Sequence, residues 1–332
     1  KAAYGKHSHK WLSIYIEGKV MKSDIAIPKE KTLRTVTAKE RKRKMALWGW
    51  FFIAPTFIGL LILNVIPLFQ SLYMSFQNVS TFGTSTFVGM DNYMHMLQDP
   101  EFWQSLKNTF FYAAIQVPIT IVLSLFFAVL MNTKIKAVGL YRTIFFLPMI
   151  AAPAAVAMVW RWLFNSEYGL LNAVLDKLGY SGNILWITDP DVAIWSIIIV
   201  GIWTNVGYNM ILLLAGLKEI PKEYYEAAVV DGAGPLKQFF AITLPLLSPQ
   251  LFFVSVTSVI SALQVFDVIF MMFDRTNLAL KSTQSLVYMF FNESFVLNDK
   301  GYGSAVAISL VLIIMAITGI QLLAQKKWVT YD

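Results

Sequence analysis

Residues 217–249 read LKEIPKEYYEAAVVDGAGPLKQFFAITLPLLSP and form the long polar interruption in the apolar half of this 332-residue sequence. Residues 222–230 are good helix formers, and the proline before them suits the first turn of a helix because its missing N–H has no partner to lose there. Gly232 and Gly234 can end this helix, and Pro235 can begin another. The segment therefore predicts a helix, a tight turn and a second helix, placed between two membrane spans.

The composition around this segment is that of a membrane protein. Hydrophobic residues make up 57% of the chain and charged residues 14%, with a mean hydropathy of +0.58. A soluble domain carries about 25% charged residues, so this chain has too little charge to cover a water-facing surface. A helix needs ~20 apolar residues to cross the hydrocarbon core of a bilayer. Six stretches meet that length, at residues 48–69, 109–131, 139–164, 192–217, 251–273 and 304–324.

These features define the predicted fold class, an all-α membrane protein with six transmembrane helices and a helix–turn–helix segment between the fourth and the fifth. Residues 1–44 precede the first span as a basic tail, and residues 45–332 form the transmembrane domain. A basic tail of this kind is typical of a topology signal or a contact with anionic lipid. No aromatic-rich basic fold accompanies it, so nucleic acid is not an expected partner. Met21 is a natural start, and residues 1–20 are expected to be additional to the mature chain.

Lysine and arginine predict the orientation, because cytoplasmic loops carry an excess of both residues. Of the 27 basic residues, 21 fall on the side that holds the N-terminal tail, residues 217–249 and the C-terminus. The other side has the remaining six, which are Lys107, Arg161, Lys177, Arg275, Lys281 and Lys300. We therefore expect the N-terminus, the C-terminus and the helix–turn–helix segment to be cytoplasmic.

A motif inside the segment resembles that of a known family. Glu226-Ala227-Ala228 is followed after three residues by Gly232, and after nine more by Ile242-Thr243-Leu244-Pro245. This spacing is similar to the EAA signature of permease subunits of ABC importers. The resemblance implies that the segment is a cytoplasmic coupling helix, which docks into a cleft on an ATPase subunit. It assigns that contact to Glu226, Ala227, Ala228, Asp231, Gly232, Ala233 and Gly234.

From about residue 48 onwards the chain also resembles the maltose-type sugar permeases. The similar stretches include Phe145-Phe146-Leu147-Pro148, Gly301-Tyr302-Gly303-Ser304-Ala305 and the ending Lys327-Trp328-Val329-Thr330-Tyr331-Asp332, which is similar to the first of two paired permeases. The family often has a Gly-Gly-Pro turn after the fifth span, and this chain has Asp274-Arg275-Thr276 there. The departure weakens the expected contact of that loop with a binding protein.

The resemblance implies a set of partners and a location. They are a second, similar permease, two ATPase subunits that carry ATP and magnesium, and an extracytoplasmic sugar-binding protein. The location is the cytoplasmic, or inner, membrane of a prokaryote, which the chain crosses several times. The expected function is uptake of a sugar or oligosaccharide. A permease for another solute, such as a phosphorylated polyol or a peptide, is the nearest alternative.

No nucleotide-binding motif occurs in the sequence. The phosphate-binding pattern GxxxxGK[ST] is absent, and Gly232-Ala233-Gly234 continues into proline rather than lysine. The spans have no charged relay of the kind that an ion-coupled secondary transporter needs, and no paired acid and base or metal cluster that a membrane enzyme needs. We therefore expect a transport subunit without an active site, cofactor or metal of its own, with a secondary transporter as the alternative from another class.

Polar residues within the spans are the candidates for substrate contact. The fourth span has Asn205, Tyr208 and Asn209, and the fifth has Thr257, Ser261 and Gln264, with Asp267 one turn nearer the outside. Residues at i, i+3 and i+4 share one face of a helix. Amides and hydroxyls can bind the hydroxyls of a neutral sugar, and an aromatic ring can cover its flat face. The alternative is that these groups hold helices together, as polar residues in membrane helices commonly do.

The unequal distribution of basic residues generates a topology prediction. A reporter fused after Asp332 and another inserted next to Gly234 should both report a cytoplasmic position, because both sites lie on the side with 21 basic residues. Activity of paired cytoplasmic and periplasmic reporters measures this. A periplasmic signal at Gly234 would contradict both the topology and the coupling role of the segment.

Overall fold

The computed structural model describes residues 38–79, 85–133, 136–180 and 182–330. Nearly all of this part of the chain is helical, apart from loops and one two-stranded antiparallel hairpin. The chain divides into two units, Lys1–Gly59 and Leu60–Asp332. Most of the predicted basic tail, residues 1–37, lies outside the described residues.

The described part of the first unit is the helix α1 (Ala38–Leu60) without its last residue. Its first turns contain the basic run at residues 39–44, so the helix begins within the predicted tail, before the boundary at residue 45. The helical stretch Arg41–Met74 contains the first predicted span and is long and apolar enough to cross a membrane. None of its most apolar window is buried within the chain, which suits contact with lipid.

The second unit contains all the other elements, in which η marks a π-helical turn. Its first part has η1 (Leu61–Val65), α2 (Ile66–Met74), β1 (Gln77–Val79), β2 (Ser85–Phe87) and α3 (Asp91–Gln98). Its central part has α4 (Pro100–Met131), α5 (Val138–Ile150), α6 (Pro153–Leu163), α7 (Leu170–Lys177) and α8 (Ala193–Glu219). Its last part has α9 (Lys222–Val230), α10 (Pro235–Gln238), η2 (Phe239–Thr243), α11 (Leu244–Leu246), α12 (Ser248–Leu263), α13 (Asp267–Met272), α14 (Leu280–Thr283), α15 (Leu286–Phe291), η3 (Asn292–Val296) and α16 (Lys300–Trp328).

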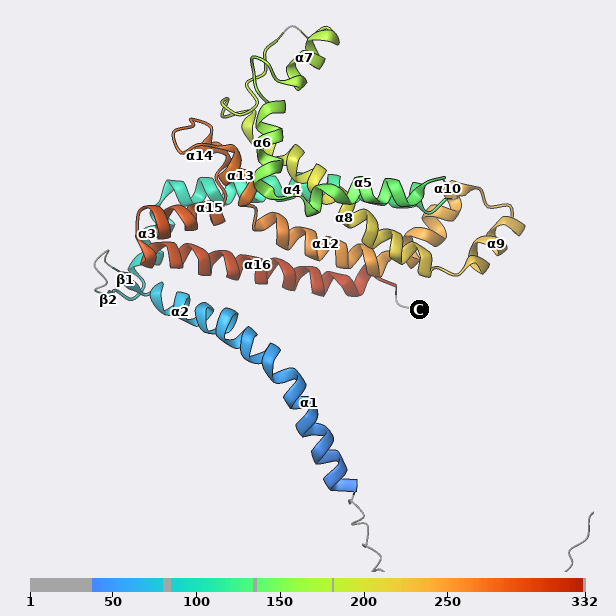
Figure 1. The fold of residues 1–332 in the computed structure, drawn as a ribbon, viewed down its shortest axis with the longest axis horizontal. Coiled ribbons are helices and arrows are strands. Elements are labelled where there is room, and N and C mark those ends of the chain that lie inside the picture. Colours follow the sequence, from blue (N-terminus) through green and yellow to red (C-terminus); the bar gives the residue numbers. More distant parts are fainter. Residues whose placement is uncertain (1–37, 80–84, 134–135, 181, 331–332) are drawn as a thin grey trace, which may run out of the picture. The chain divides into compact units, whose positions relative to one another are not determined.

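The prediction of six membrane spans agrees with the structure when bent helices are counted. Besides the first stretch, α4, α8 and α16 are each long and apolar enough to cross a membrane. Two helix pairs meet the criterion together, α5 with α6 at a bend of 98° and Pro235–Leu246 with α12 at a bend of 66°. Counting each pair once gives six spans in the described part of the chain. Figure 1 shows α4, α8, α12 and α16 running alongside one another.

The third predicted span, residues 139–164, is broken in the middle. α5 ends at Ile150, and the next two alanines have extended backbones before Pro153 begins α6. A residue before proline disfavours the helical conformation, and proline has no N–H to continue the helix. The small-residue run at 151–155, which we expected to pack closely against other helices, is mainly exposed within this chain. The bend therefore separates two shorter helices where the sequence indicated one.

The fifth predicted span, residues 251–273, is also wrong as a continuous helix. α12 ends at Leu263, and α13 begins after a gap of three residues. In that gap the hydroxyl of Ser285 donates a hydrogen bond to the carbonyl of Val265, at 2.6 Å. Phe266 packs against the rings of neighbouring aromatic residues in α13 and α15. These tertiary contacts override a local sequence that is apolar enough to continue the helix.

The second and last spans begin earlier than predicted because of their caps. Asp99 accepts a hydrogen bond from the N–H of Glu101 at 2.8 Å, and Pro100 occupies the first turn of α4. Asp299 accepts one from the N–H of Tyr302 at 2.9 Å and caps α16 in the same way. An aspartate just before the first turn is a helix-start signal. Because of these two aspartates, α4 and α16 begin in polar sequence outside the apolar stretches.

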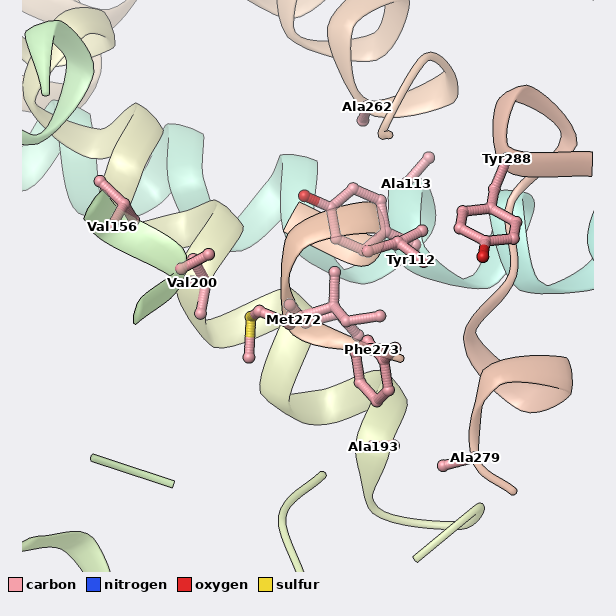
Figure 2. Packing of buried hydrophobic residues seen from close by; sticks show 14 of the residues in the cluster. Tyr112, Ala113, Val156, Ala193, Val200, Ala262, Met272, Phe273, Ala279 and Tyr288 are labelled. Carbon is pink, nitrogen blue, oxygen red and sulfur yellow. The ribbon is translucent and has the colours of Figure 1, made fainter. Parts of the chain in front are cut away.

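Close contacts of glycine hold α8 at the centre of the second unit. A Cβ atom added at Gly207 would lie 1.7 Å from the carbonyl oxygen of Phe145 in α5, and one at Gly201 would lie 2.1 Å from the hydroxyl of Tyr112 in α4. One cluster of buried apolar residues joins α8 to α4, α6, α12 and α13 (Figure 2). The missing side chains therefore let α4 and α5 approach the backbone of α8, as small residues do in membrane helix packing.

The contact at Gly207 generates a stability prediction. Gly207→Ala should lower the thermal stability of the purified protein, because its Cβ would push α5 away from α8, and overpacking typically costs about 1–3 kcal/mol. The midpoint of thermal unfolding in detergent measures this. Gly319→Ala in α16 is the matched control, since an added Cβ there meets no atom within 4 Å and should leave the midpoint equal or higher. Equal midpoints for the wild type and the Gly207 variant would contradict the close approach.

Candidate functional site

The segment at residues 217–249 folds as the sequence predicts. α9 covers Lys222–Val230, with Pro221 just before it in extended backbone, and α10 begins at Pro235. The return path continues through η2 and α11 into α12, so the second helix is longer and more bent than expected. Figure 1 shows α9 and α10 at one end of the bundle and the strands at the other.

α9 ends in a cap that needs glycine at one position. The N–H of Gly232 donates to the carbonyl of Val229 at 3.0 Å, and the N–H of Ala233 donates to that of Ala228 at 2.8 Å. This pair of bonds is the Schellman motif, in which the residue after the helix adopts a left-handed backbone. Gly232 has φ of 73°, which glycine adopts without steric cost. The glycine of the signature is therefore explained first by the turn itself.

The seven predicted coupling residues lie around this turn. Glu226, Ala227, Asp231, Gly232 and Gly234 are exposed, and Ala228 and Ala233 are half-buried. Large apolar side chains that the motif did not select are exposed beside them: Val230 by 87%, Leu236 by 76% and Phe240 by 63%. The placement of Val230 at the last position of α9 and Leu236 at the start of α10 could have indicated them. Apolar groups exposed beside acidic ones form a surface that suits a protein partner.

Two side-chain hydrogen bonds hold the turn against the return path. The hydroxyls of Tyr225 in α9 and Thr243 in η2 share a hydrogen bond of 3.0 Å. The amide nitrogen of Gln238 donates to the carbonyl of Ala233 at 2.7 Å. These bonds tie α9 and its turn to the helix that follows them in the chain.

A polar cavity of about 200 Å³ lies between α4, α8, α12 and the start of α13. Its polar lining consists of Tyr112, Gln116, Thr204, Asn205, Ser258, Ser261, Gln264 and Asp267. Hydroxyl and amide groups from three helices thus face one space. Such groups both donate and accept hydrogen bonds, as a ligand rich in hydroxyls requires. Among these lining residues, Asp267 carries the charge.

Four of the seven predicted substrate residues line this cavity: Asn205, Ser261, Gln264 and Asp267. Their surroundings differ from the expected ones at two points. Asp267 is exposed in the first turn of α13 and is not a buried carboxylate inside a continuous fifth span. Gln264 lies at the end of α12, where the helix has stopped. The break after α12 therefore turns both groups toward the cavity.

The other three predicted residues lie outside the cavity lining. Asn209 is buried and donates from Nδ2 to the hydroxyl of Ser258 at 2.9 Å, which joins α8 to α12. Thr257 donates to a backbone carbonyl of its own helix at 2.9 Å, and Tyr208 is 37% exposed. Positions three and four residues after Asn205 are rotated by about 60° and 40° to opposite sides of it, so one narrow cavity does not meet all three.

The residues of α4 that line the cavity were not among those predicted from the sequence. Gln116 is buried and donates from Nε2 to the hydroxyl of Thr120 at 3.0 Å and to the carbonyl of Gly201 at 3.4 Å. Tyr112 lies one turn before it and also lines the cavity. The spacing of Tyr112, Gln116 and Thr120 at every fourth residue is the same signal that singled out polar groups in the fourth span. It was available in the second span as well.

A second polar group lies at the other end of the bundle from α9. The hydroxyl of Tyr302 donates to Asp99 at 2.6 Å, and the side-chain amide of Gln284 donates to Glu101 at 3.0 Å. Burial, together with the negative charges of Glu101, Asp299 and Asp99, raises the pKa of Glu293 to about 7. The first bond ties the start of α16 to the start of α4, and the second ties α4 to the loop between α14 and α15.

The apolar spans, the polar cavity between them and the rigid turn at one end define a multi-span membrane transport component. The chain belongs to the family described as binding-protein-dependent transport system inner membrane component, which matches residues 102–329. Proteins of this family are permease subunits, so the chain is a transport subunit and not an enzyme. The resemblance to permeases of ABC importers is thereby confirmed.

Three relatives cover most of this chain. The probable ABC transporter permease YesP of Bacillus subtilis is 39% identical over 87% of this chain and 94% of its own length. The lactose transport system permease LacF of Rhizobium radiobacter is 32% identical over 89% of this chain and 99% of its own. The sn-glycerol-3-phosphate transport system permease UgpA of Pectobacterium atrosepticum is 32% identical over 85% and 95%.

A solved structure shares the fold. It is a bacterial alginate ABC transporter in complex with an alginate pentasaccharide-bound periplasmic protein. One of its chains matches this chain with a TM-score of 0.75 and 21% identity, over 87% of this chain and 96% of that chain. At this level of identity the likeness concerns the fold, and it agrees with the predicted all-α membrane architecture.

Proposed function

We propose that this chain forms the transmembrane pathway of an ATP-driven importer that takes up a sugar or oligosaccharide delivered by an extracytoplasmic binding protein. The observation that carries the proposal is the cavity lined by hydroxyl and amide groups of α4, α8 and α12. A sugar presents many hydroxyls, and each needs a partner when it leaves water. Asn205, Ser261, Gln264 and Asp267 are proposed substrate contacts, together with Gln116.

Relatives of similar identity are named for lactose and for sn-glycerol-3-phosphate, so both solute classes are candidates. The cavity favours the sugar. Its lining contains the carboxylate Asp267 and neither lysine nor arginine. A phosphate group in this space would meet a like charge without a positive partner from this chain, and like charges at short range repel each other. A phosphorylated polyol is therefore the second candidate.

Energy is proposed to enter through the turn at the end of α9. Glu226, Ala227, Ala228, Asp231, Gly232, Ala233 and Gly234 are the proposed contacts with an ATPase subunit that binds ATP and magnesium. The exposed apolar side chains of Val230 and Leu236 support a protein partner at this tip. The hydrogen bond between Tyr225 and Thr243 supports transmission of the movement to α12.

The remaining partners and the location complete the proposal. A second, similar permease pairs with this chain, two ATPase subunits bind the cytoplasmic face, and a sugar-binding protein docks outside. The N-terminal tail at residues 1–44, α9 and the C-terminus face the cytoplasm of a prokaryote, while residues 45–332 form the permease domain. The distribution of basic residues supports this orientation. The alginate transporter, whose structure includes a periplasmic protein, supports the docking.

Reconstitution tests the proposed function. The complex is purified with its ATPase and partner permease, placed in lipid vesicles and supplied with binding protein and labelled lactose, an oligosaccharide mixture or sn-glycerol-3-phosphate. We expect ATP-dependent uptake of a sugar, with hydrolysis stimulated by the loaded binding protein. Uptake that needs an ion gradient and no ATP would identify a secondary transporter instead. Uptake of glycerol phosphate alone would establish the second candidate.

The lining of the cavity generates a prediction about substrate contact. Asn205→Ala, Gln264→Ala and Asp267→Asn should each lower uptake at limiting substrate by about fivefold to tenfold, the effect of losing ~1 kcal/mol of hydrogen bonding. Thr257→Ala is the matched control and should leave uptake unchanged, because its hydroxyl bonds its own helix. Uptake and recovery of the assembled complex are measured together. Loss of assembly in all four variants would show that these groups hold helices together.

The cap of α9 generates a prediction about coupling. Gly232→Asp should insert normally but lose most of its bound ATPase and its transport, because a charge buried at the docking contact without a partner costs several kcal/mol. Co-purification of the ATPase with the permease measures the loss. Gly232→Asn is the control, since asparagine has nearly the same shape and tolerates positive φ. Full retention of the ATPase and normal uptake in the Gly232→Asp variant would show that this turn is not the coupling element.

A further inference from the structure

The return path from α9 bends where two prolines flank a serine. Pro249 has no N–H, so the carbonyl of Pro245 loses the donor that a continuous helix would supply four residues later. The hydroxyl of Ser248 donates to that carbonyl instead, at 2.6 Å. The chain turns by 66° at this point, between Pro235–Leu246 and α12. Ser248 thus satisfies the carbonyl that the bend leaves without a backbone partner.

The same hydroxyl oxygen also accepts a hydrogen bond from the last described residue of the chain. The backbone N–H of Thr330 donates to the oxygen of Ser248 at 3.0 Å. Two residues earlier, the ring of Trp328 meets the ring of Phe252 in α12 edge to face, with 5.9 Å between centroids. Ser248 is 3% exposed, so both of its hydrogen bonds are shielded from water. The end of α16 and the residues after it therefore hold the bend from one side.

α8 holds the bend from another side. A Cβ atom added at Gly216 would lie 2.4 Å from the side chain of Gln250 and 2.9 Å from that of Leu247. Leu247 is the residue at the bend and is 1% exposed. The bend is therefore enclosed by the end of α8 and by the segment that follows α16.

The position of the bend links the two parts of the functional site. On one side, Thr243 of η2 bonds Tyr225 of α9 at 3.0 Å. On the other side, α12 runs to the cavity and contributes Ser258 and Ser261 to its lining. A rigid bend passes movement of α9 to these residues, whereas a loose one absorbs it.

We propose that Ser248 and the backbone N–H of Thr330 form a latch that fixes the angle between the coupling segment and α12. Ser248 is then a positioning residue for transport. It touches neither substrate nor ATPase and acts by holding α12 in register with α9. This inference rests on the proposed function, because it needs α9 to receive the ATPase movement and the cavity to receive the substrate.

Two independent pairs of variants test the latch. Ser248→Ala removes both bonds, and Ser248→Thr keeps the hydroxyl as the conservative rescue. Thr330→Pro removes the N–H donor, and Thr330→Ala keeps it while removing the side chain. Val329 already has an extended backbone, with φ of −90° and ψ of 124°, which a following proline accepts. Because Thr330→Pro leaves the bond from Ser248 to Pro245 intact, it tests the latch without exposing the carbonyl at the bend.

The readout is substrate transported per ATP hydrolysed by the full complex in vesicles. We expect this ratio to fall about fivefold in Thr330→Pro, the effect expected for one buried hydrogen bond, and at least as far in Ser248→Ala, which removes both bonds. Ser248→Thr and Thr330→Ala should keep the wild-type ratio. The double variant Ser248→Ala with Thr330→Pro should be no worse than Ser248→Ala alone, since Ser248→Ala already removes the bond that Thr330→Pro removes.

Outcomes against the latch are distinct from failure of the proposed function. An unchanged ratio in Thr330→Pro, or additive losses in the double variant, would overturn the latch while the complex still imports sugar with ATP. A complex that neither hydrolyses ATP on addition of loaded binding protein nor transports a sugar in its wild-type form would overturn the proposed function itself. Equal loss of ATPase co-purification in Ser248→Ala and Ser248→Thr would assign the serine a merely structural part, which also counts against the latch.

Discussion

The structure depends on the constraint that backbone N–H and C=O groups within a membrane must find partners inside the protein. Prolines violate this locally because they have no N–H to donate, and at two of them the backbone ahead of the proline forms a π-helical turn. The π-helical turns η1 and η2 each end two residues before a proline, at Pro67 and Pro245. In each turn the residue after it donates to a carbonyl five positions earlier, which shifts the bonding pattern ahead of the missing N–H.

The broken helices create the features that a transport subunit needs. The end of α12 at Leu263 exposes Gln264 and turns Asp267 toward the space between α4 and α8. The bend before α12 joins the cavity helix to the segment that carries α9. A straight fifth span would have placed these groups along one helix face and would have lacked the joint. Irregular backbone at such depth occurs where it is buried in protein or lines a cavity, and the gap after α12 fits that rule.

This chain has two kinds of exposed apolar surface, which suit different neighbours. The stretch Arg41–Met74 is apolar and unburied over a length that matches a bilayer, so lipid is the natural neighbour. The tip around Val230 and Leu236 is short, carries acidic residues and stands on a turn fixed by two backbone hydrogen bonds. Preorganisation of that kind lowers the entropy lost on binding a protein. The same chemical property therefore suits lipid in one place and the proposed ATPase partner in the other.

Sequence alone determined the elements that depend on local rules. Apolar length gave the number of spans, and the glycine that needs positive φ marked the end of α9, because both follow from short-range geometry and hydropathy. The motif likewise identified the permease family without any coordinates. Tertiary structure decided the rest. Whether Asn205 or Asn209 meets the cavity depends on how α8 rotates against α12, and the stop after Leu263 depends on Ser285, which is distant in sequence. The contact between Ser248 and Thr330 joins residues 82 positions apart, and no local pattern encodes a pairing that only the folded helices bring together.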